Sequence, residues 1–131
     1  MPYFSNRSMQ KLFTCDERLQ RIAIEVIKYL DITITDGHRS REDQERAYHA
    51  GLSKLQYPKS KHNKVPSLAM DCVPYPINYD QPEAFYYMAG YIQAVANKMD
   101  IPIRWGGDWD KDHDFYDQHF IDLPHFELID D

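Results

Sequence analysis

The sequence predicts an α+β fold in which helices flank a small antiparallel sheet. Two longer segments carry apolar residues at helical spacing, and several short β-branched or apolar runs lie between and after them. These elements do not alternate with the spacing of βαβ units, which favours an α+β arrangement over a parallel sheet. The chain has 131 residues and shows no repeat and no Gly/Ser-rich linker, so we expect one domain over residues 1–131.

Three helices are predicted, each from a capping signal followed by a helix-forming segment. They cover approximately residues 15–30, 41–50 and 80–99. The predicted caps are Thr14 with Glu17, Ser40, and Asp80 with Glu83. Gly90 lies inside the third helix, where glycine costs about 1 kcal/mol relative to alanine, so we expect it to mark a close helix packing.

The predicted strands are short β-branched, aromatic or apolar runs bounded by turn residues. They cover residues 32–35, 68–73, 101–105, 120–122 and 125–129. Two segments between these elements are expected to be loops. Residues 52–67 are rich in lysine and contain proline, and residues 106–119 are acidic with glycines and aromatic residues.

Composition and charge narrow the classes of function. The hydrophobic fraction of 43% and the charged fraction of 27% are ordinary for a globular domain. The net charge of −6, without a cluster of Lys and Arg, argues against nucleic-acid binding. No segment approaches the roughly 20 apolar residues of a membrane span, and the first residues do not resemble a signal peptide. We therefore expect a cytoplasmic monomer that does not insert into membranes.

The two cysteines, Cys15 and Cys72, do not form a CxxC pair, which excludes a cysteine-based zinc knuckle. Two free buried thiols are favoured over one disulfide bond. Free thiols suit the reducing conditions of the cytoplasm.

Two segments hold side chains suited to metal chemistry. His62 lies in the lysine-rich loop, and Asp71 lies within a predicted apolar strand. A carboxylate among apolar residues loses its hydration unless a positive group binds it. Asp122 and His125 lie three positions apart in the last segment. Two histidines and one aspartate make a three-ligand set typical of catalytic zinc, with water in the fourth position.

Zinc at such a set lowers the pKa of its bound water from 15.7 to about 7. A nearby carboxylate can then move the proton of that water to a leaving amine, and Asp122 is the candidate for this role. Judged by spacing alone, a histidine in such a segment is more often an ordinary surface or core residue than a metal ligand. Other sets of three ligands can also be drawn from the remaining histidines. The remaining histidines are His38, His49, His113 and His119.

Four motifs occur in order between about Phe4 and Leu128. They are Gly37-His38-Arg39-Ser40 before a helix with Gln44 and Tyr48, Ser60-x-His62 with Ala69-x-Asp71, Trp105-Gly106-Gly107-Asp108-Trp109, and Asp122-Leu123-Pro124-His125-Phe126-Glu127. Together they resemble the zinc D-Ala-D-Ala carboxypeptidase and L-alanyl-D-glutamate endopeptidase family, which includes many phage endolysins.

The resemblance implies the D-Ala-D-Ala peptidase or hedgehog-like fold, in which the sheet carries the zinc site. The implied zinc ligands are His62, Asp71 and His125. It implies Asp122 as general base, and Arg39 as the group that holds the developing oxyanion or a substrate carboxylate. The implied reaction is hydrolysis of an amide in a peptidoglycan stem peptide, first of all the L-alanyl-D-glutamate bond. The resemblance also implies a phage lysis enzyme that stays in the host cytoplasm until it is released to the cell wall.

One feature departs from the family pattern. Asp71 follows His62 by nine positions, which is more than usual, and the spacer contains Pro66 but no glycine. We interpret this as a longer turn that still delivers both ligands. Three other functions stay open: a carboxypeptidase that releases terminal D-alanine, a non-catalytic peptidoglycan-binding module of the same fold, and an unrelated domain with scattered histidines.

Two further groups carry more than one interpretation. Alternating carboxylates in the loop after Gly107 offer oxygen ligands for Ca²⁺, but the loop lacks the Gly and distal Glu of an EF-hand, so a solvated acidic loop is favoured. These carboxylates are Asp108, Asp110, Asp112 and Asp114. Four aromatic residues are assigned equally to a substrate groove or to packing, namely Tyr75, Tyr79, Trp105 and Trp109.

Overall fold

A computed structural model describes residues 2–113 and 121–129 of the chain. Its centre is a four-stranded antiparallel sheet of order β1-β2-β4-β3. The strands are β1 (Ile32–Asp36), β2 (Ala69–Pro74), β3 (Ile103–Gly106) and β4 (Asp122–Leu128). The helices are α1 (Asn6–Leu12), α2 (Glu17–Ile27), α3 (Arg41–His49) and α4 (Pro82–Lys98), with a 3₁₀ turn η1 (Lys61–Asn63). The predicted α+β class and antiparallel sheet are confirmed.

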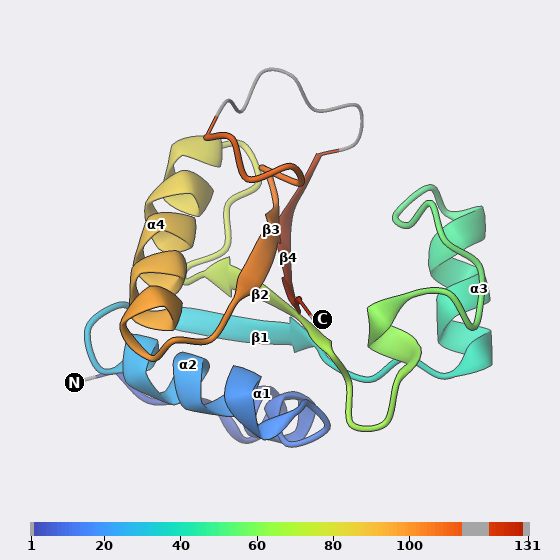
Figure 1. Cartoon of the computed structure of the whole chain (residues 1–131), viewed down its shortest axis with the longest axis horizontal. Coiled ribbons are helices and arrows are strands. Elements are labelled where there is room, and N and C mark those ends of the chain that lie inside the picture. Colours follow the sequence, from blue (N-terminus) through green and yellow to red (C-terminus); the bar gives the residue numbers. More distant parts are fainter. Residues whose placement is uncertain (1, 114–120, 130–131) are drawn as a thin grey trace.

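The helices fall into two groups around the sheet (Figure 1). Helices α1, α2 and α4 lie together beside the sheet, whereas α3 stands apart from it beyond the ends of β1 and β2. Helices α2 and α4 each bury five apolar residues, and these pack with the apolar side chains of the strands into one core. Because each fully buried aliphatic or aromatic side chain contributes roughly 1.5–3 kcal/mol, this core makes the sheet a firm support for side chains along its strands.

Helix α2 begins close to its predicted start but with a different cap. The Asp16 side chain accepts a hydrogen bond from the Arg18 backbone N–H at 2.9 Å. The Thr14 hydroxyl instead donates to the carbonyl of Lys11 near the end of α1. Periodicity did not predict α1, because this helix of seven residues buries only two side chains.

Helix α4 also begins without its predicted cap. Gln81 occupies the N-cap position without a side-chain hydrogen bond, and Pro82 opens the helix, where its missing N–H costs nothing. The capping role expected for Asp80 and Glu83 is therefore wrong. The close packing expected at Gly90 is also wrong, because this residue is exposed and an added Cβ would meet no atom within 4 Å.

The final strand differs most from its prediction. Residues 120–122 and 125–129 were expected to form two strands around Pro124, but β4 runs through this proline as one strand from Asp122 to Leu128; residue 120 lies outside the described residues. The register between β3 and β4 shifts between Trp105 and Gly106, so Pro124 lies in an irregular stretch where a missing N–H is tolerated. Trp105 Nε1 donates to the carbonyl of Leu123 at 2.8 Å across this irregularity.

Both cysteines lie in the core as free thiols, as expected. Burial raises the pKa of Cys15 to about 12, and burial also raises the pKa of Cys72. In the described part of the chain, none of the helices combines the length and the apolar character that a membrane crossing requires.

Candidate metal centre and its cleft

The strand register brings acidic and imidazole side chains into one row across the sheet. Asp36 of β1 pairs with Asp71 of β2, and Asp71 pairs with His125 of β4. Paired positions on antiparallel strands point their side chains to the same face. The sheet therefore places Asp71 and His125 side by side although the two residues are far apart in the chain.

His62 reaches this row from η1, outside the sheet. The hydroxyl of Ser60 accepts from the His62 backbone N–H at 3.2 Å, and the Ser60 N–H donates to the Asn63 side chain at 3.1 Å. The Leu68 N–H then donates to the Lys61 carbonyl at 3.1 Å, which closes the long spacer before β2. The additional residues of the spacer thus form a turn that returns the chain to the sheet, as expected from the sequence.

Three donor atoms converge in the centre of this arrangement. His62 Nε2 lies 3.2 Å from Asp71 Oδ1 and 3.2 Å from His125 Nδ1, and His125 Nδ1 lies 3.4 Å from the same oxygen. Ligands about 2.0–2.1 Å from a tetrahedral zinc are separated by about 3.3 Å, which matches these three edges. His62 and His125 are buried, and Asp71 is 9% exposed.

Each imidazole has a hydrogen-bond partner on the side away from this centre, and its other ring nitrogen points toward the centre. His62 Nδ1 lies 2.7 Å from the Gly37 carbonyl, and His125 Nε2 lies 2.8 Å from Glu127 Oε1. A carbonyl and a carboxylate only accept, so these nitrogens carry the hydrogens. His62 Nε2 and His125 Nδ1 are then left as the nitrogens that can bind a metal.

Asp71 supplies the test of whether a cation fits. Its Oδ1 is buried and makes no hydrogen bond within the described residues, although both imidazoles are close. Burial alone would raise the pKa of this carboxyl, but His62 and His125 hold its pKa well below the usual range. A buried, ionised oxygen without a hydrogen bond, beside two oriented imidazoles, is the donor set that a divalent cation such as zinc binds.

Glu127 is a site residue for which the sequence suggested no role. Its carboxylate accepts a hydrogen bond from His125 Nε2 and forms ion pairs with Arg104 Nη2 at 2.8 Å and Lys61 Nζ at 3.5 Å. Burial would raise the pKa of Glu127, but the hydrogen bonds from His125 and Arg104 lower it to about 2. The sequence did contain a signal, because Glu127 is a charged residue inside an apolar strand, two positions after a candidate ligand.

Arg39 lies against the candidate ligand Asp71. Its Nη2 donates to Asp71 Oδ2 at 3.1 Å, its Nε donates to Asp36, and its Nη1 lies 3.3 Å from Gln44 Oε1. The guanidinium is thus held on the carboxylate oxygen that faces away from the imidazoles. Only 11% of the side chain is exposed, yet this residue also lines the neighbouring cleft.

Asp122 stands at the edge of the same centre, with Oδ2 3.9 Å from His125 Nδ1. Burial, and then the charge of Asp71, raise the pKa of Asp122 to about 6. A carboxyl group with such a pKa accepts and releases protons near neutral pH. Its position and its pKa both suit the role of general base that the sequence predicted.

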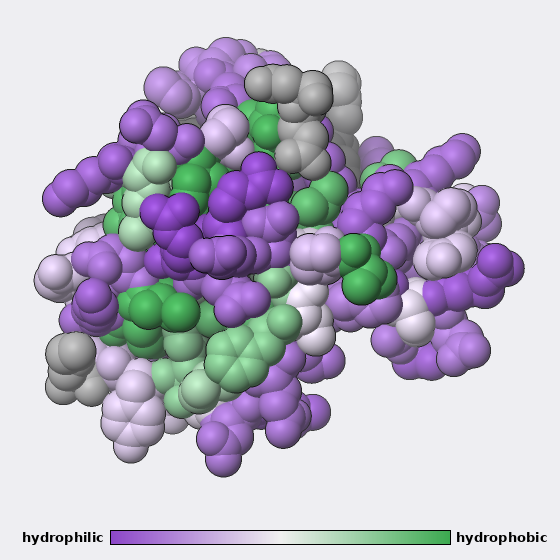
Figure 2. Space-filling view, turned by 60° about the horizontal axis from the view of Figure 1, so that its bottom comes forward, coloured by the Kyte–Doolittle hydropathy of each residue, from purple (hydrophilic) through white to green (hydrophobic). Residues whose placement is uncertain are grey.

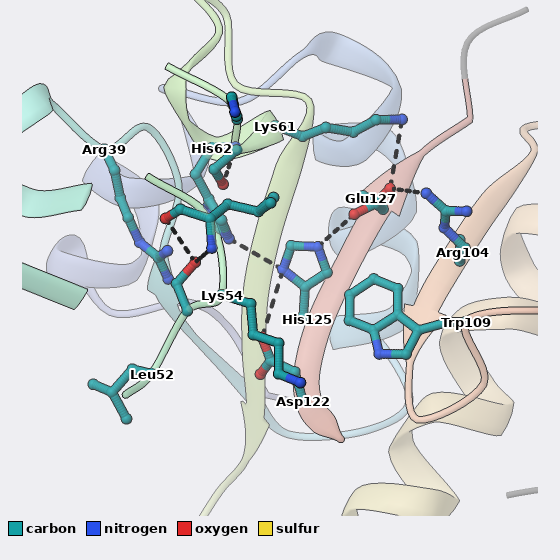
Figure 3. Close-up of a pocket in the computed structure, with 14 residues that line it drawn as sticks. Arg39, Leu52, Lys54, Lys61, His62, Arg104, Trp109, Asp122, His125 and Glu127 are labelled. Atoms are coloured by element: carbon teal, nitrogen blue, oxygen red, sulfur yellow. Dashed lines mark hydrogen bonds and ion pairs between the residues drawn. The ribbon is translucent and has the colours of Figure 1, made fainter. Parts of the chain in front are cut away.

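The centre opens into a cleft of about 330 Å³ (Figure 3). Trp109 and Leu52 lie on opposite sides of the cleft in Figure 3, and Asp122, His125 and the rest of the segment from Leu52 to Leu55 also line it. The rings of Trp109 and His125 lie 5.3 Å apart. The cleft also contains cationic side chains, those of Arg39, Lys54, Lys59, Lys61 and Arg104. An elongated peptide with carboxylate groups fits such a lining.

Other residues singled out from the sequence lie elsewhere. Trp105 is buried in the core, so the groove interpretation holds for Trp109 and not for Trp105. Tyr75 and Tyr79 are exposed and do not line the cleft. His38, His49 and His113 are described and are not part of the His/Asp/His cluster, and His119 lies outside the described residues.

A second group of carboxylates gathers in the acidic loop. Oxygen atoms of Asp108, Asp110 and Asp112 lie within 4.8 Å of one another. Asp108 is 3% exposed, its Oδ2 accepts from the His113 backbone N–H at 3.0 Å, and its Oδ1 has no hydrogen-bond partner among the described residues. Asp114 lies outside the described residues.

Comparisons with known proteins place the chain in a family and a fold. A family model described as "Phage L-alanyl-D-glutamate peptidase" matches residues 1–129. The L-alanyl-D-glutamate peptidase of Escherichia phage T5 is 30% identical over 96% of this chain and 97% of its own length. The crystal structure of the Serratia marcescens L-Ala D-Glu endopeptidase ChiX has the same fold, with a TM-score of 0.75 and 23% identity over 98% of this chain and 91% of that one. The chain belongs to the phage L-alanyl-D-glutamate peptidase family.

Proposed function

We propose that this protein is a zinc-dependent endopeptidase that hydrolyses the L-alanyl-D-glutamate bond of peptidoglycan stem peptides. The observation that carries the proposal is the convergence of His62 Nε2, Asp71 Oδ1 and His125 Nδ1 beside Asp122, in a cleft that can hold a peptide. Membership of the phage L-alanyl-D-glutamate peptidase family supports the choice of bond.

His62, Asp71 and His125 would hold the zinc ion. A zinc ion bound there would act as a Lewis acid and would lower the pKa of a coordinated water. Gly37 and Glu127 keep the two imidazoles in the tautomers that leave the binding nitrogens free.

Asp122 and Arg39 have separate roles in the proposed reaction. Asp122 takes the proton of the attacking water and delivers it to the amine that leaves, which its pKa of about 6 allows. Arg39 orients Asp71 through Oδ2, and from the edge of the cleft its guanidinium holds the developing oxyanion or a carboxylate of the substrate.

Digestion of purified peptidoglycan tests the proposed reaction directly. Mass spectrometry of the fragments is expected to reveal new N-terminal D-glutamate. Release of free D-alanine without new D-glutamate termini would contradict the assignment and indicate a carboxypeptidase. Binding of peptidoglycan without any cleavage would indicate a non-catalytic module.

Removal of the metal tests the choice of cofactor. A chelator is expected to abolish cleavage, and stoichiometric Zn²⁺ is expected to restore it. Full activity of a protein shown to be metal-free by elemental analysis would refute the zinc proposal.

A lysis role follows from the phage origin of the matched family and of the T5 relative. We propose that the protein is a single-domain monomer that stays in the host cytoplasm until it reaches the cell wall. Fractionation of infected cells before lysis checks the location, and sedimentation of the purified protein checks the oligomeric state.

The acidic loop has a separate test. Asp108, Asp110 and Asp112 offer the oxygen ligands that Ca²⁺ prefers, while a solvated loop requires no ion. Titration of the zinc-loaded protein with Ca²⁺ decides between the two interpretations. Saturable binding that Asp110→Asn weakens would establish a calcium site, and absence of binding would leave a solvated loop.

A further inference from the structure

One wall of the cleft belongs to a segment that lacks an apolar core. We call residues 41–59, which comprise α3 and the turn after it, the arm. The arm projects from the body beyond the sheet, and the surface that it presents is largely hydrophilic (Figures 1 and 2). Gln44 is the one buried residue in the arm, and it is 0% exposed. Hydrophobic burial therefore does little to hold this wall in place.

The side-chain amide of Gln44 joins the arm to the metal centre. On one side, Gln44 Oε1 lies 3.3 Å from Arg39 Nη1 and 3.3 Å from Asn63 Nδ2. On the other side, Gln44 Nε2 donates to the Leu55 carbonyl at 2.6 Å and to the Ser53 hydroxyl at 3.0 Å. The amide thus makes two bonds as acceptor and two as donor.

The chemistry of these partners determines which way the amide points. Arg39 only donates and the Leu55 carbonyl only accepts, so Oε1 must face the centre and the NH₂ group must face the turn. A carboxylate cannot donate to Leu55, and an apolar side chain would leave buried polar groups on both sides without partners. A neutral amide is the group that satisfies all four partners.

We infer that Gln44 is a positioning residue that sets the arm wall, Leu52 to Leu55, at its distance from Arg39 and His62. This inference rests on the proposed function, because it assigns the arm wall to binding the stem peptide. Gln44 does not line the cleft, so it acts through Arg39, Ser53 and Leu55 rather than by touching the substrate.

The sharpest test is Gln44→Glu, which keeps the side-chain length and the acceptor for Arg39 but removes both donors. A carboxylate then faces the Leu55 carbonyl, so the arm wall loosens while the zinc ligands stay in place. We expect KM for a stem-peptide substrate to rise about tenfold or more, with a much smaller change in kcat and unchanged zinc affinity. An unchanged KM, or a fall in kcat alone, would overturn the inference.

A matched control separates the position from the chemical change. Gln93→Glu makes the same substitution on α4, where Gln93 Nε2 donates to the Ala89 carbonyl at 3.2 Å, away from the cleft. We expect its kinetic constants to equal those of the wild type. A rise in KM equal to that of Gln44→Glu would show that the effect does not come from the arm.

Hydrogen exchange gives a readout that does not depend on activity. In Gln44→Glu, amides of residues 52–57 are expected to exchange faster, while those of α4 keep their protection. If the wild type cleaves no stem peptide, the proposed function fails, but this measurement still tests whether Gln44 holds the arm. Unchanged exchange in the arm would overturn the inference.

A milder variant serves if Gln44→Glu does not fold. Ser53→Ala removes one acceptor on the arm side and leaves Arg39 and Asn63 bonded to Gln44. We expect a rise in KM of about two- to fivefold with kcat retained, because the variant loses the bond from Gln44 Nε2 and the two local bonds between the Ser53 hydroxyl and the Leu55 backbone. Wild-type KM together with wild-type exchange in this variant would also contradict the role of Gln44.

Discussion

The two walls of the cleft are held in place by different forces. The sheet wall carries Asp71 and His125 on paired central strands above an apolar core, and buried partners orient their side chains. The arm wall belongs to a segment, residues 41–59, in which Gln44 is the one buried residue, and its position depends on the Gln44 amide. From this difference we expect the proposed metal centre to be rigid and the arm wall to tolerate changes without loss of the metal.

Substitution of a ligand on the sheet wall is expected to have the largest effect. His125→Ala removes one of three protein ligands, so zinc affinity should fall by more than about 100-fold, the upper end of the loss from an outer-shell partner. Cleavage should fall to background. Elemental analysis after dialysis measures the zinc content, and full occupancy in this variant would break the ligand assignment.

Loss of the proposed base should separate chemistry from metal binding. Asp122→Ala is expected to lower kcat by about 10²–10⁴-fold, because the proton of the water no longer has an acceptor. Zinc content and the unfolding temperature should stay close to those of the wild type. Undiminished wall lysis by this variant would remove Asp122 from the mechanism.

The outer contact of His125 should have an intermediate effect. Glu127→Gln weakens the hydrogen bond to His125 Nε2 and leaves Arg104 with a neutral partner. Zinc affinity is therefore expected to fall by about 10–100-fold. Competition with a chromophoric chelator measures this change. Glu25→Gln, in an exposed pair with Lys28, is the control and should bind zinc as the wild type does.

The pH dependence of cleavage should follow Asp122. Its pKa is raised to about 6, and the base acts only when deprotonated, so activity should increase with pH up to about 6 and then level off. A bound cation favours the charged form of a nearby carboxyl, which would move this inflection below 6 and not above it. A pH profile of kcat/KM for the zinc-loaded enzyme tests the prediction, and activity that rises steadily from pH 6 to pH 8 would contradict it.

The smallest effect is expected on the arm wall itself. Leu52 is 69% exposed and lines the cleft, so Leu52→Ala should raise KM by about threefold through lost apolar contact with the substrate. Zinc affinity should not change. A loss of zinc in this variant would show that the two walls are not independent.

The sequence predicted the parts of the fold that depend on local patterns. Helix α3 has its expected Ser40 cap, and β1 and β2 lie within one residue of their predicted bounds. Helix α1 and the continuous β4 were missed, because α1 has few apolar residues and because Pro124 ordinarily ends a strand.

The candidate site was predicted unevenly for a similar reason. His62, Asp71 and His125 were identified from motifs, and the structure brings their donor atoms together. The roles of Glu127 and Gln44 depend on partners distant in sequence, Arg104 and Lys61 for the first and Asn63 and Leu55 for the second. Such contacts can be identified only when the strand register and the paths of the loops are known, because no local sequence pattern specifies them.

Anomalous diffraction from a zinc-loaded crystal, recorded at the zinc absorption edge, is the most direct measurement. We expect one strong peak at about 2.0–2.2 Å from His62 Nε2, Asp71 Oδ1 and His125 Nδ1 together, with an open side toward Asp122 and the cleft. A peak bound by other residues, or these three side chains turned away from one ion, would contradict it.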